Sequence, residues 1–230
     1  MNKSNRLQIA LELARPAPNG LGFKQVLAID QSTSQLEQAQ PHEGVEYRAG
    51  DAYAIPCPPA TASLITVAQA AHWFDMPRFL AEAQRVLQPR GWLAIIGYGA
   101  CRLHPPPAQA VFAGYYDALG SRKPPGAAGC YWDCDRRILD SGHAGLAVTP
   151  YLREASVARD WFEDTRTLSL DQLDGYLRTW SAYRTYGTLH PAAAPDIVSS
   201  TMEGIREAVG DGASTVDVTF PFFLVTVQRD

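Results

Sequence analysis

Short apolar segments recur through the first hundred residues, and segments with helical spacing separate them. Compact or alternating apolar runs typical of β-strands occupy four stretches, residues 26–29, 45–48, 63–67 and 92–98. Two helices are predicted between them, at residues 35–40, where Ser32 or Ser34 can cap the first turn, and at 78–87, where Pro77 suits a helix start. Strands alternating with helices predict an α/β fold, a Rossmann-like and mostly parallel sheet.

The pattern loosens in the middle of the chain and becomes regular again after it. Six prolines and few periodic positions mark residues 101–151, which we expect to form a lid or insertion within a single domain, 1–230. Inside this segment a helix is predicted at 108–119 and a loop at 123–130. Beyond it the pattern predicts a strand at 158–167, helices at 169–183 and 195–209, and an antiparallel closing strand at 216–227. Ser169 and Gln172 fit a helix capping box.

Composition narrows the classes of function. The formal charge is −4, and the 20 basic residues form no run, so nucleic acid is not an expected partner. The four cysteines lack the paired spacing of a zinc site, so no metal is expected. No apolar run reaches the length of a membrane span. We therefore expect a cytoplasmic protein with reduced cysteines and no membrane partner. A homodimer is compatible with these features.

Four stretches of the chain together resemble a known family. They are Asp30-Gln-Ser, EYRAGDAYAIP at 46–56, TVAQAAHWFD at 66–75 and RVLQPRGWLA at 85–94. In this order they are similar to the motifs of class I S-adenosylmethionine-dependent methyltransferases, closest to the small-molecule branch of trans-aconitate and farnesoate-type enzymes. The helix expected around YLRTWS at 176–181 is also typical of that branch. The resemblance runs from about residue 23 to the C-terminus.

The resemblance implies a set of cofactor-binding residues, to which Gln31 belongs. Asp30 would accept hydrogen bonds from the ribose hydroxyls of S-adenosylmethionine, although an aspartate that caps a helix gives the same pattern. Asp51 and Ala52 would lie at the adenine, or form a plain turn. Gln69 and Ala70 would line the methyl-donor cleft at the end of the fourth strand.

The same resemblance suggests residues for the methyl acceptor. His72 is the catalytic candidate: it would orient a carboxylate acceptor, or act as a base toward a hydroxyl. Trp73 could wall the pocket, and both residues could equally belong to the core. Trp132, Trp180 and Tyr183 are the other predicted substrate-binding residues, although aromatic residues at helical spacing are more often core. Arg178, Arg184 or Arg102 could bind an acceptor carboxylate by a two-pronged contact.

One family feature is missing from the sequence. A first strand, a glycine-rich turn, a helix and the strand that ends at Asp30 together need roughly 35 residues, and only 29 residues precede Asp30. In register with the family, residues 5–14 are the helix after the turn, and the turn falls before Met1. In a rival register, alternating leucines and Ile9 form a strand, and residues 18–22 form a degenerate turn. The first strand is therefore expected to be missing or replaced.

Three functions fit these features. The leading hypothesis is a methyltransferase that uses S-adenosylmethionine to modify a small-molecule carboxylate or hydroxyl acceptor. The alternative is a non-catalytic member of the family that binds a small ligand or a partner chain, which the absent glycine turn favours. A nicotinamide-dependent oxidoreductase would explain Asp30, but it requires a glycine fingerprint for which Gly20 and Gly22 are a poor match.

Overall fold

The computed structural model describes residues 9–16, 23–192 and 194–230. The chain divides into two compact units. Unit 1 contains residues up to Gly97 together with Gly142–Trp161 and Phe223–Asp230, and unit 2 contains Tyr98–Ser141 and Phe162–Phe222. The segment 101–151, expected as a lid, contributes residues to both units.

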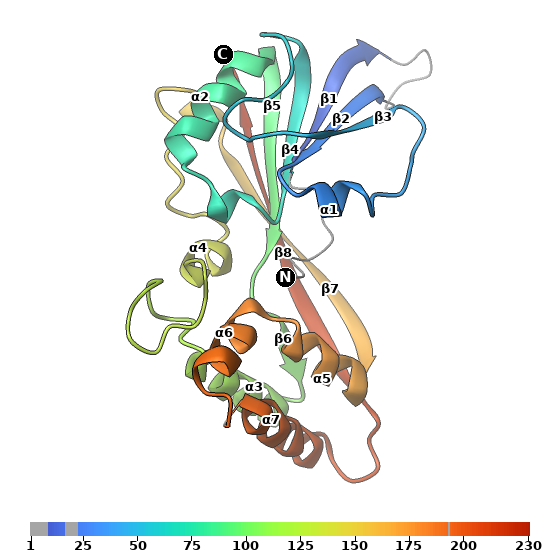
Figure 1. The fold of residues 1–230 in the computed structure, drawn as a ribbon, viewed down its shortest axis with the longest axis vertical. Helices are drawn as coiled ribbons and strands as arrows, with labels where there is room; N and C mark the ends of the chain where they lie inside the picture. Colours follow the sequence, from blue (N-terminus) through green and yellow to red (C-terminus); the bar gives the residue numbers. More distant parts are fainter. Residues whose placement is uncertain (1–8, 17–22, 193) are drawn as a thin grey trace. The chain divides into compact units, whose positions relative to one another are not determined.

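Eight strands form one hydrogen-bonded sheet, in the order β3-β2-β1-β4-β5-β8-β6, with β7 paired to β8. Figure 1 shows β1 to β4 side by side. The strands are β1 (Ile9–Pro16), β2 (Phe23–Asp30), β3 (Val45–Ala49), β4 (Ala62–Ala68), β5 (Leu87–Tyr98), β6 (Arg102–His104), β7 (Ala158–Ser169) and β8 (Thr215–Gln228).

Strands β2 to β5 all point the same way. β2 pairs parallel with β3, β4 pairs parallel with β5, and β1 is antiparallel to both β2 and β4. β6 and β8 form an antiparallel pair. The expected α/β fold with four parallel strands and an antiparallel final strand is confirmed, and a reversed β1 takes the place of the first strand.

Strand β1 decides between the two interpretations of the N-terminal segment. Residues 9–14, which one register places in a helix and the other in a strand, are extended and belong to the strand. Leu11 lies opposite Leu27 of β2 and Ile65 of β4, so each neighbour gains a partner for its backbone groups. Two otherwise open strand edges favour an extended conformation here. The predicted degenerate turn at 18–22 lies outside the described residues.

Helix α2 (Met76–Val86) of unit 1 buries one apolar face, where a helix was predicted at 78–87. Phe79, Leu80, Ala83 and Val86 of α2 are each at most 1% exposed. Asp75 caps this helix by accepting a hydrogen bond from the backbone N–H of Arg78. The predicted helix at 35–40 is a single turn that starts earlier. The helical segments are α1 (Thr33–Leu36), the 3-10 helices η1 (Ala71–Trp73) and η2 (Glu154–Ser156), and α2 (Met76–Val86).

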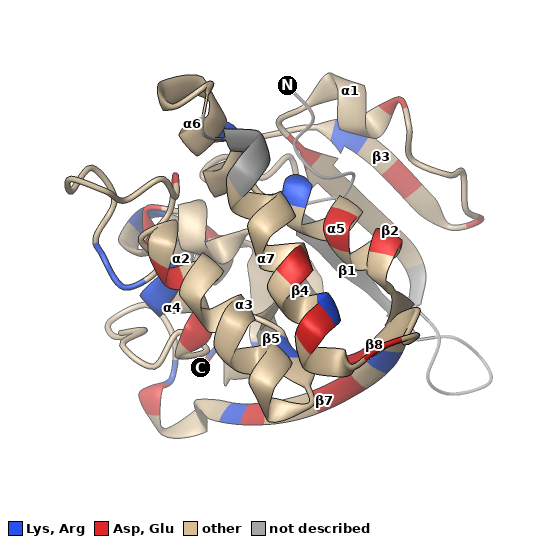
Figure 2. Ribbon diagram, turned by 90° about the horizontal axis from the view of Figure 1, so that it is seen from below, with Lys and Arg blue, Asp and Glu red and all other residues tan. Residues whose placement is uncertain are grey.

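Unit 2 packs its helices around a second core. The helices α3 and α7 lie side by side, as Figures 1 and 2 show. Phe112, Leu173, Leu177, Val198 and Ile205 are among the fully buried residues of this core. Its helices are α3 (Pro106–Ala118), α4 (Arg136–Asp140), α5 (Leu170–Arg178), α6 (Ser181–Leu189) and α7 (Ala194–Val209).

The predicted helix at 169–183 is two helices in the structure. Helix α5 ends at Arg178, and α6 begins at Ser181 after Trp180, whose backbone is extended. The predicted capping box is confirmed: Ser169 Oγ accepts from the N–H of Gln172, and Gln172 Oε1 accepts from the N–H of Ser169. The structure also starts β5 at Leu87, which the sequence analysis placed at the end of the helix over residues 78–87.

Candidate functional site

Polar residues follow the ends of three parallel strands of unit 1. Asp30 ends β2, Asp51 comes two residues after β3, and Gln69 directly follows β4. In open α/β sheets, ligands bind at this carboxyl edge of the strands. The sequence prediction that these residues share one edge therefore agrees with the strand directions.

Asp30 is buried, with only 2% of its surface exposed. One carboxylate oxygen, Oδ1, accepts a hydrogen bond of 2.7 Å from the N–H of Ser32, at the entrance to α1. The other oxygen, Oδ2, is buried and has no hydrogen-bond partner within the described part of the chain. A buried acceptor without a partner costs free energy. One oxygen thus fits the capping interpretation, and the other is available to a ligand.

The loop after β3 lies next to this carboxylate. The backbone carbonyl of Asp30 accepts a hydrogen bond from the N–H of Gly50, and the side-chain amide of Gln31 donates to Asp51 Oδ1 at 3.3 Å. Asp51 Oδ1 also accepts from the N–H of Tyr53, and Ala52 is only 5% exposed. The structure therefore brings the predicted ribose and adenine residues together.

The segment after β4 carries four more predicted residues. Gln69 has a left-handed backbone, with φ of 51°, which is uncommon for a residue other than glycine. Its N–H donates to the carbonyl of Ile96 at 2.7 Å. Ala70 is buried, His72 is half-buried, and Trp73 is half exposed. The rings of His72 and Trp73 lie 5.0 Å apart on η1.

Tyr53 joins the two loops and was missed by the sequence analysis. Its hydroxyl accepts a hydrogen bond of 2.7 Å from the N–H of Asp75, 22 residues away along the chain. Its ring lies against Phe74 and carries the guanidinium of Arg78 at 4.3 Å. The loop after β3 and the loop that leads into α2 are therefore held together by one side chain.

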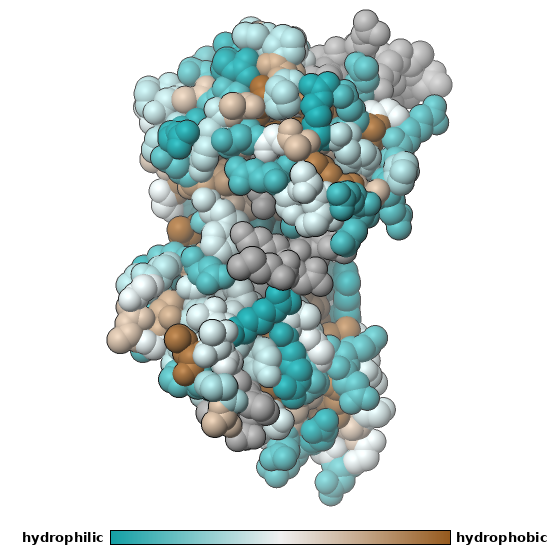
Figure 3. All heavy atoms as spheres, in the orientation of Figure 1, coloured by the Kyte–Doolittle hydropathy of each residue, from teal (hydrophilic) through white to brown (hydrophobic). Residues whose placement is uncertain are grey.

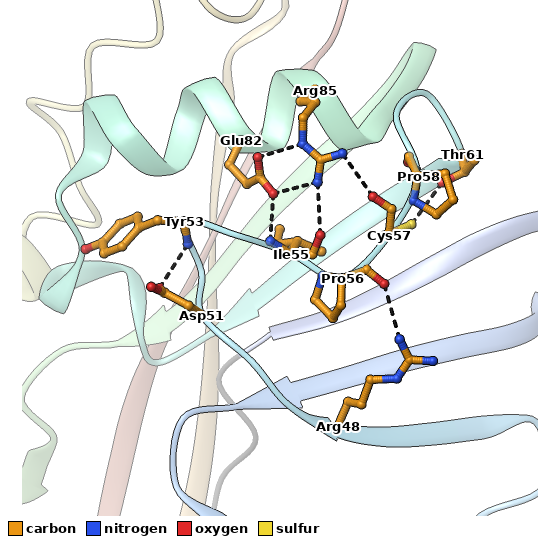
Figure 4. Close-up of polar contacts among 10 residues, drawn as sticks. All are labelled: Arg48, Asp51, Tyr53, Ile55, Pro56, Cys57, Pro58, Thr61, Glu82 and Arg85. Atoms are coloured by element: carbon orange, nitrogen blue, oxygen red, sulfur yellow. Dashed lines mark hydrogen bonds and ion pairs between the residues drawn. The ribbon is translucent and has the colours of Figure 1, made fainter.

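A charged pair on α2 fixes the same loop from its other end, as Figure 4 shows. Glu82 Oε1 accepts a hydrogen bond of 2.6 Å from the N–H of Ile55 and another from Arg85. Arg85 donates to the carbonyls of Ile55 and Cys57 at 2.9 and 3.0 Å. The hydrogen bonds from Arg85 lower the pKa of Glu82 below its ordinary value, against the effect of burial.

The sequence analysis also missed this pair. Its signal was an acid and an arginine three residues apart on the polar side of α2, a spacing that usually indicates a solvated ion pair. The carbonyls and the N–H that it holds are 27 to 30 residues away along the chain. The pair acts as a clamp on residues 55–57, and we call it the Glu82–Arg85 clamp.

The three predicted acceptor aromatics belong to unit 2 and pack into its core. Trp132 is 8% exposed, and Trp180 and Tyr183 are partly buried against the same cluster. The rings of Trp132 and Trp180 lie 5.3 Å apart, and the Tyr183 hydroxyl accepts a hydrogen bond from Arg178. Core packing accounts for all three residues, and their acceptor-binding role stays a prediction.

Charge and hydropathy are mixed over the surface that the figures show. Along β7 basic and acidic residues are interspersed (Figure 2), and hydrophobic residues form small separate groups on the face drawn in Figure 3. In the described ranges, no cluster of three or more His, Cys, Asp or Glu side chains could hold a metal ion. Among those same residues, no helix is long and apolar enough to cross a bilayer.

The comparisons with known proteins all point to methyltransferases. Residues 9–95 match the sequence profile of the family described as a methyltransferase domain. A Dictyostelium discoideum protein provisionally named as a methyltransferase is 29% identical over 211 residues, which cover 90% of this chain and 75% of the relative. An uncharacterized methyltransferase of Schizosaccharomyces pombe is 35% identical over 74 residues, covering 32% of this chain and 30% of the relative.

A solved structure extends the likeness to the fold. The protein, from Anaeromyxobacter dehalogenans, is provisionally named as a type II methyltransferase. It is 30% identical, with a TM-score of 0.71, and the match covers 90% of this chain and 81% of that one. The fold and the strand-edge site define a Rossmann-like α/β protein. The chain belongs to the class I S-adenosylmethionine-dependent methyltransferase family.

Proposed function

We propose that this protein transfers a methyl group from S-adenosylmethionine to a small-molecule carboxylate or hydroxyl acceptor. The observation that carries the proposal is the unpartnered, buried Oδ2 of Asp30 at the carboxyl end of β2. A carboxylate can accept two hydrogen bonds from neighbouring hydroxyls of one sugar. A ribose diol would satisfy the oxygen that the described protein groups leave without a donor.

The residues around Asp30 fit the rest of an adenosyl group. Asp51 already accepts from Gln31 and Tyr53, and a carboxylate has lone pairs left for an exocyclic amine. The small side chain of Ala52 admits a flat ring, and Gln69 with Ala70 would line the methyl-donor end. When bound, S-adenosylmethionine supplies a methyl group on a positively charged sulfur.

Methyl transfer would depend mainly on how the acceptor oxygen is positioned. A carboxylate acceptor is already a nucleophile at neutral pH, so in that case His72 would orient the acceptor oxygen and would not need to remove a proton. A hydroxyl acceptor must lose its proton, and His72 would then serve as the general base. Trp73 would exclude water from one side of the acceptor.

A second candidate function is a non-catalytic family member that binds a ligand or a partner chain. Strand β1 favours it, because this strand is reversed between β2 and β4. Its carboxyl end, at Pro16, pairs with Phe23 at the opposite end of β2 from Asp30. The strand that carries the glycine-rich turn in the family ends at the same edge as that aspartate. The protein would then still descend from methyltransferases, but it would bind the cofactor more weakly.

Calorimetric titration with S-adenosylhomocysteine tests cofactor binding. We expect saturable binding to the full chain, and Asp30→Ala should remove most of it because the ribose loses its acceptor. Asp30→Asn keeps an acceptor for the N–H of Ser32, so it separates loss of the ligand from loss of the fold. Asp211→Ala, at an exposed turn, is the control. No heat at millimolar ligand would reject the proposal and leave the non-catalytic alternative.

Methyl transfer itself needs a separate measurement. Incubation with methyl-labelled S-adenosylmethionine and a pool of small carboxylates and alcohols should give labelled products that hydrolysis sorts into esters and ethers. His72→Ala should slow ether formation more than ester formation, since only a hydroxyl needs a base. Binding of the cofactor without any labelled product from the pool would argue for the non-catalytic alternative.

A further inference from the structure

Unit 2 contains a pocket that the proposed methyl-donor site does not use. Its volume is about 570 Å³, and its wall comes entirely from residues between Ala100 and Ser141. Pockets for small organic ligands commonly measure about 300 to 1,000 Å³. This cavity is therefore large enough for a molecule of one or two rings, and it lies within a single unit of the fold.

The base of the pocket is apolar and belongs to the core of unit 2. Phe112 and Cys101 are each 1% exposed and belong to the core of unit 2. The rings of Phe112 and Tyr116, one turn apart on α3, are nearly parallel, with centroids 6.3 Å apart. Ala113 between them leaves the wall open. A flat or apolar ligand body can pack against these groups, as is usual in ligand pockets.

The wall carries three arginines against two aspartates. Arg122 is 81% exposed along its side chain and donates only through Nε, to Asp117, so its terminal NH₂ groups have no partner in the part of the chain that the structure describes. Within the same described residues, Arg102 donates only through Nη2, to Glu163. A guanidinium has five N–H donors, so both arginines keep donors for a ligand.

The two aspartates of the wall are already occupied. Asp140 accepts from the Tyr116 hydroxyl at 2.8 Å, from the N–H of Ala100 at 3.1 Å and from Arg136 at 3.3 Å. Asp117 accepts from the Ser121 hydroxyl and from Arg122. Arg136, whose side chain is 11% exposed and lies 4.9 Å from the Trp132 ring, adds a further positive charge beside the pocket. Both aspartates thus already accept from protein donors, Asp117 through Oδ1 alone, while Arg102 and Arg122 keep unused N–H donors among the described residues.

We propose that this pocket is a binding site for a small organic anion, with an apolar body on the Phe112 and Tyr116 side and an anionic group held by Arg102 and Arg122. Exposed ion pairs such as those of Arg102 and Arg122 contribute little to stability, so both guanidinium groups can turn to a ligand at low cost. Arginine binds carboxylates in a two-pronged way that fixes their orientation. The proposal does not depend on cofactor binding.

The test uses 2-naphthoate and its neutral isostere 2-naphthamide, titrated separately into the full chain by calorimetry without cofactor. We expect saturable 1:1 binding of 2-naphthoate, and about tenfold weaker binding of 2-naphthamide, because the amide forms no charge-assisted hydrogen bonds. The double variant Arg102→Gln, Arg122→Gln should bind 2-naphthoate about tenfold more weakly and 2-naphthamide as before. The double variant Arg166→Gln, Arg206→Gln removes two exposed arginines elsewhere in unit 2 and should change neither affinity.

A second pair of variants tests the apolar side. Ala113→Phe fills the pocket from α3 and should weaken both probes, whereas Ala118→Phe, exposed on the same helix, should weaken neither. Circular dichroism of each variant checks that it folds. Absence of saturable binding, equal affinity for the two probes, or unchanged 2-naphthoate binding in the Arg102, Arg122 double variant would overturn the proposal.

The bound anion could be the methyl acceptor or a separate effector, and one added arm distinguishes them. Methyl-labelled S-adenosylmethionine is supplied with 2-naphthoate, and extraction of labelled methyl 2-naphthoate is measured. Label in the ester identifies the pocket's ligand class as an acceptor. If 2-naphthoate binds to the protein but not to the Arg102, Arg122 double variant, and no labelled ester forms, the pocket is an effector site.

Discussion

At the scale of single residues, Asp30 does two things that the sequence could not separate. Its backbone continues β2 toward α1, and its Oδ1 supports that turn through Ser32. Its Oδ2 has no such structural use within the described chain, although it is buried. Structural and ligand-binding interpretations of the same aspartate are therefore compatible, because each takes a different oxygen.

Glu82→Gln is a prediction at this scale. Glutamine can still accept from the N–H of Ile55, but it loses the charge-assisted contact with Arg85. We expect a loss of about 1 to 2 kcal/mol in the free energy of unfolding at pH 7, measured by urea denaturation, and several-fold weaker binding of S-adenosylhomocysteine through a looser Asp51 loop.

The matched control for the clamp is Glu46→Gln. Glu46 also pairs with an arginine, Arg48, but both side chains are about half exposed, at 60% and 47%. Exposed pairs of this kind contribute little, so stability should change by less than about 0.5 kcal/mol. Equal effects of the two substitutions would contradict the importance of the Glu82–Arg85 clamp.

At the scale of elements, the start of α5 has the capping box that the sequence predicts. The Ser169 and Gln172 side chains each satisfy a backbone N–H at the first turn. Ser169→Ala should therefore lower the free energy of unfolding by about 1 kcal/mol, measured by thermal and urea denaturation. Ser214→Ala, at an exposed serine without a side-chain hydrogen bond in the described structure, should be nearly neutral.

The direction of β1 gives the second prediction for an element. Ala10 of β1 lies directly opposite Ala28 of β2 in the antiparallel register. Directly opposed residues have Cβ atoms about 4.5 to 5.5 Å apart, close to the separation of a disulfide. The double variant Ala10→Cys, Ala28→Cys should form a cross-link under mild oxidation, detected by peptide mass spectrometry.

A shifted pair serves as its control. Leu13 lies opposite Gln25 and three residues away from the partner of Ala28. Leu13→Cys with Ala28→Cys should remain reduced under the same conditions. Efficient cross-linking of this second pair, with none between positions 10 and 28, would contradict the register in which Ala10 lies opposite Ala28.

At the scale of the whole molecule, stability depends on pH through His143. This histidine is 5% exposed, and burial, together with the charge of Arg159, lowers its pKa to about 4. The Phe223 ring lies 5.6 Å from it, and Arg159 donates to its carbonyl. The native state thus holds the ring neutral, whereas the unfolded chain takes up a proton below its ordinary pKa of 6.5.

The sign follows from proton linkage. Because the unfolded state binds more protons between pH 6.5 and 4, the free energy of unfolding should fall by about 1 to 2 kcal/mol from pH 7 to pH 5. His143→Asn, which suits the left-handed backbone at this position, should remove most of that slope. Urea midpoints at the two pH values measure it, and an unchanged slope in the variant would assign the pH dependence to other groups.

Much of the fold was predictable from local patterns. The apolar runs of β2, β4 and β5 and the buried face of α2 from Phe79 to Val86 are encoded by neighbouring residues, so their element types were predicted correctly. The grouping of Asp30, Asp51 and Gln69 at one edge followed from the parallel directions of their strands. The break at Trp180 was not predicted, because the helical spacing continues through it.

The sequence by itself determined the α/β class, the strand ends that carry the polar residues and the cap of α5, because each depends on residues close together along the chain. Only the tertiary structure decided the conformation of β1: its residues fit a helix and a strand equally, and two open neighbours supplied the partners that selected the strand. Tyr53 and the Glu82–Arg85 clamp were decided in the same way. Their backbone partners lie 22 to 30 residues away, so no local pattern records the contact.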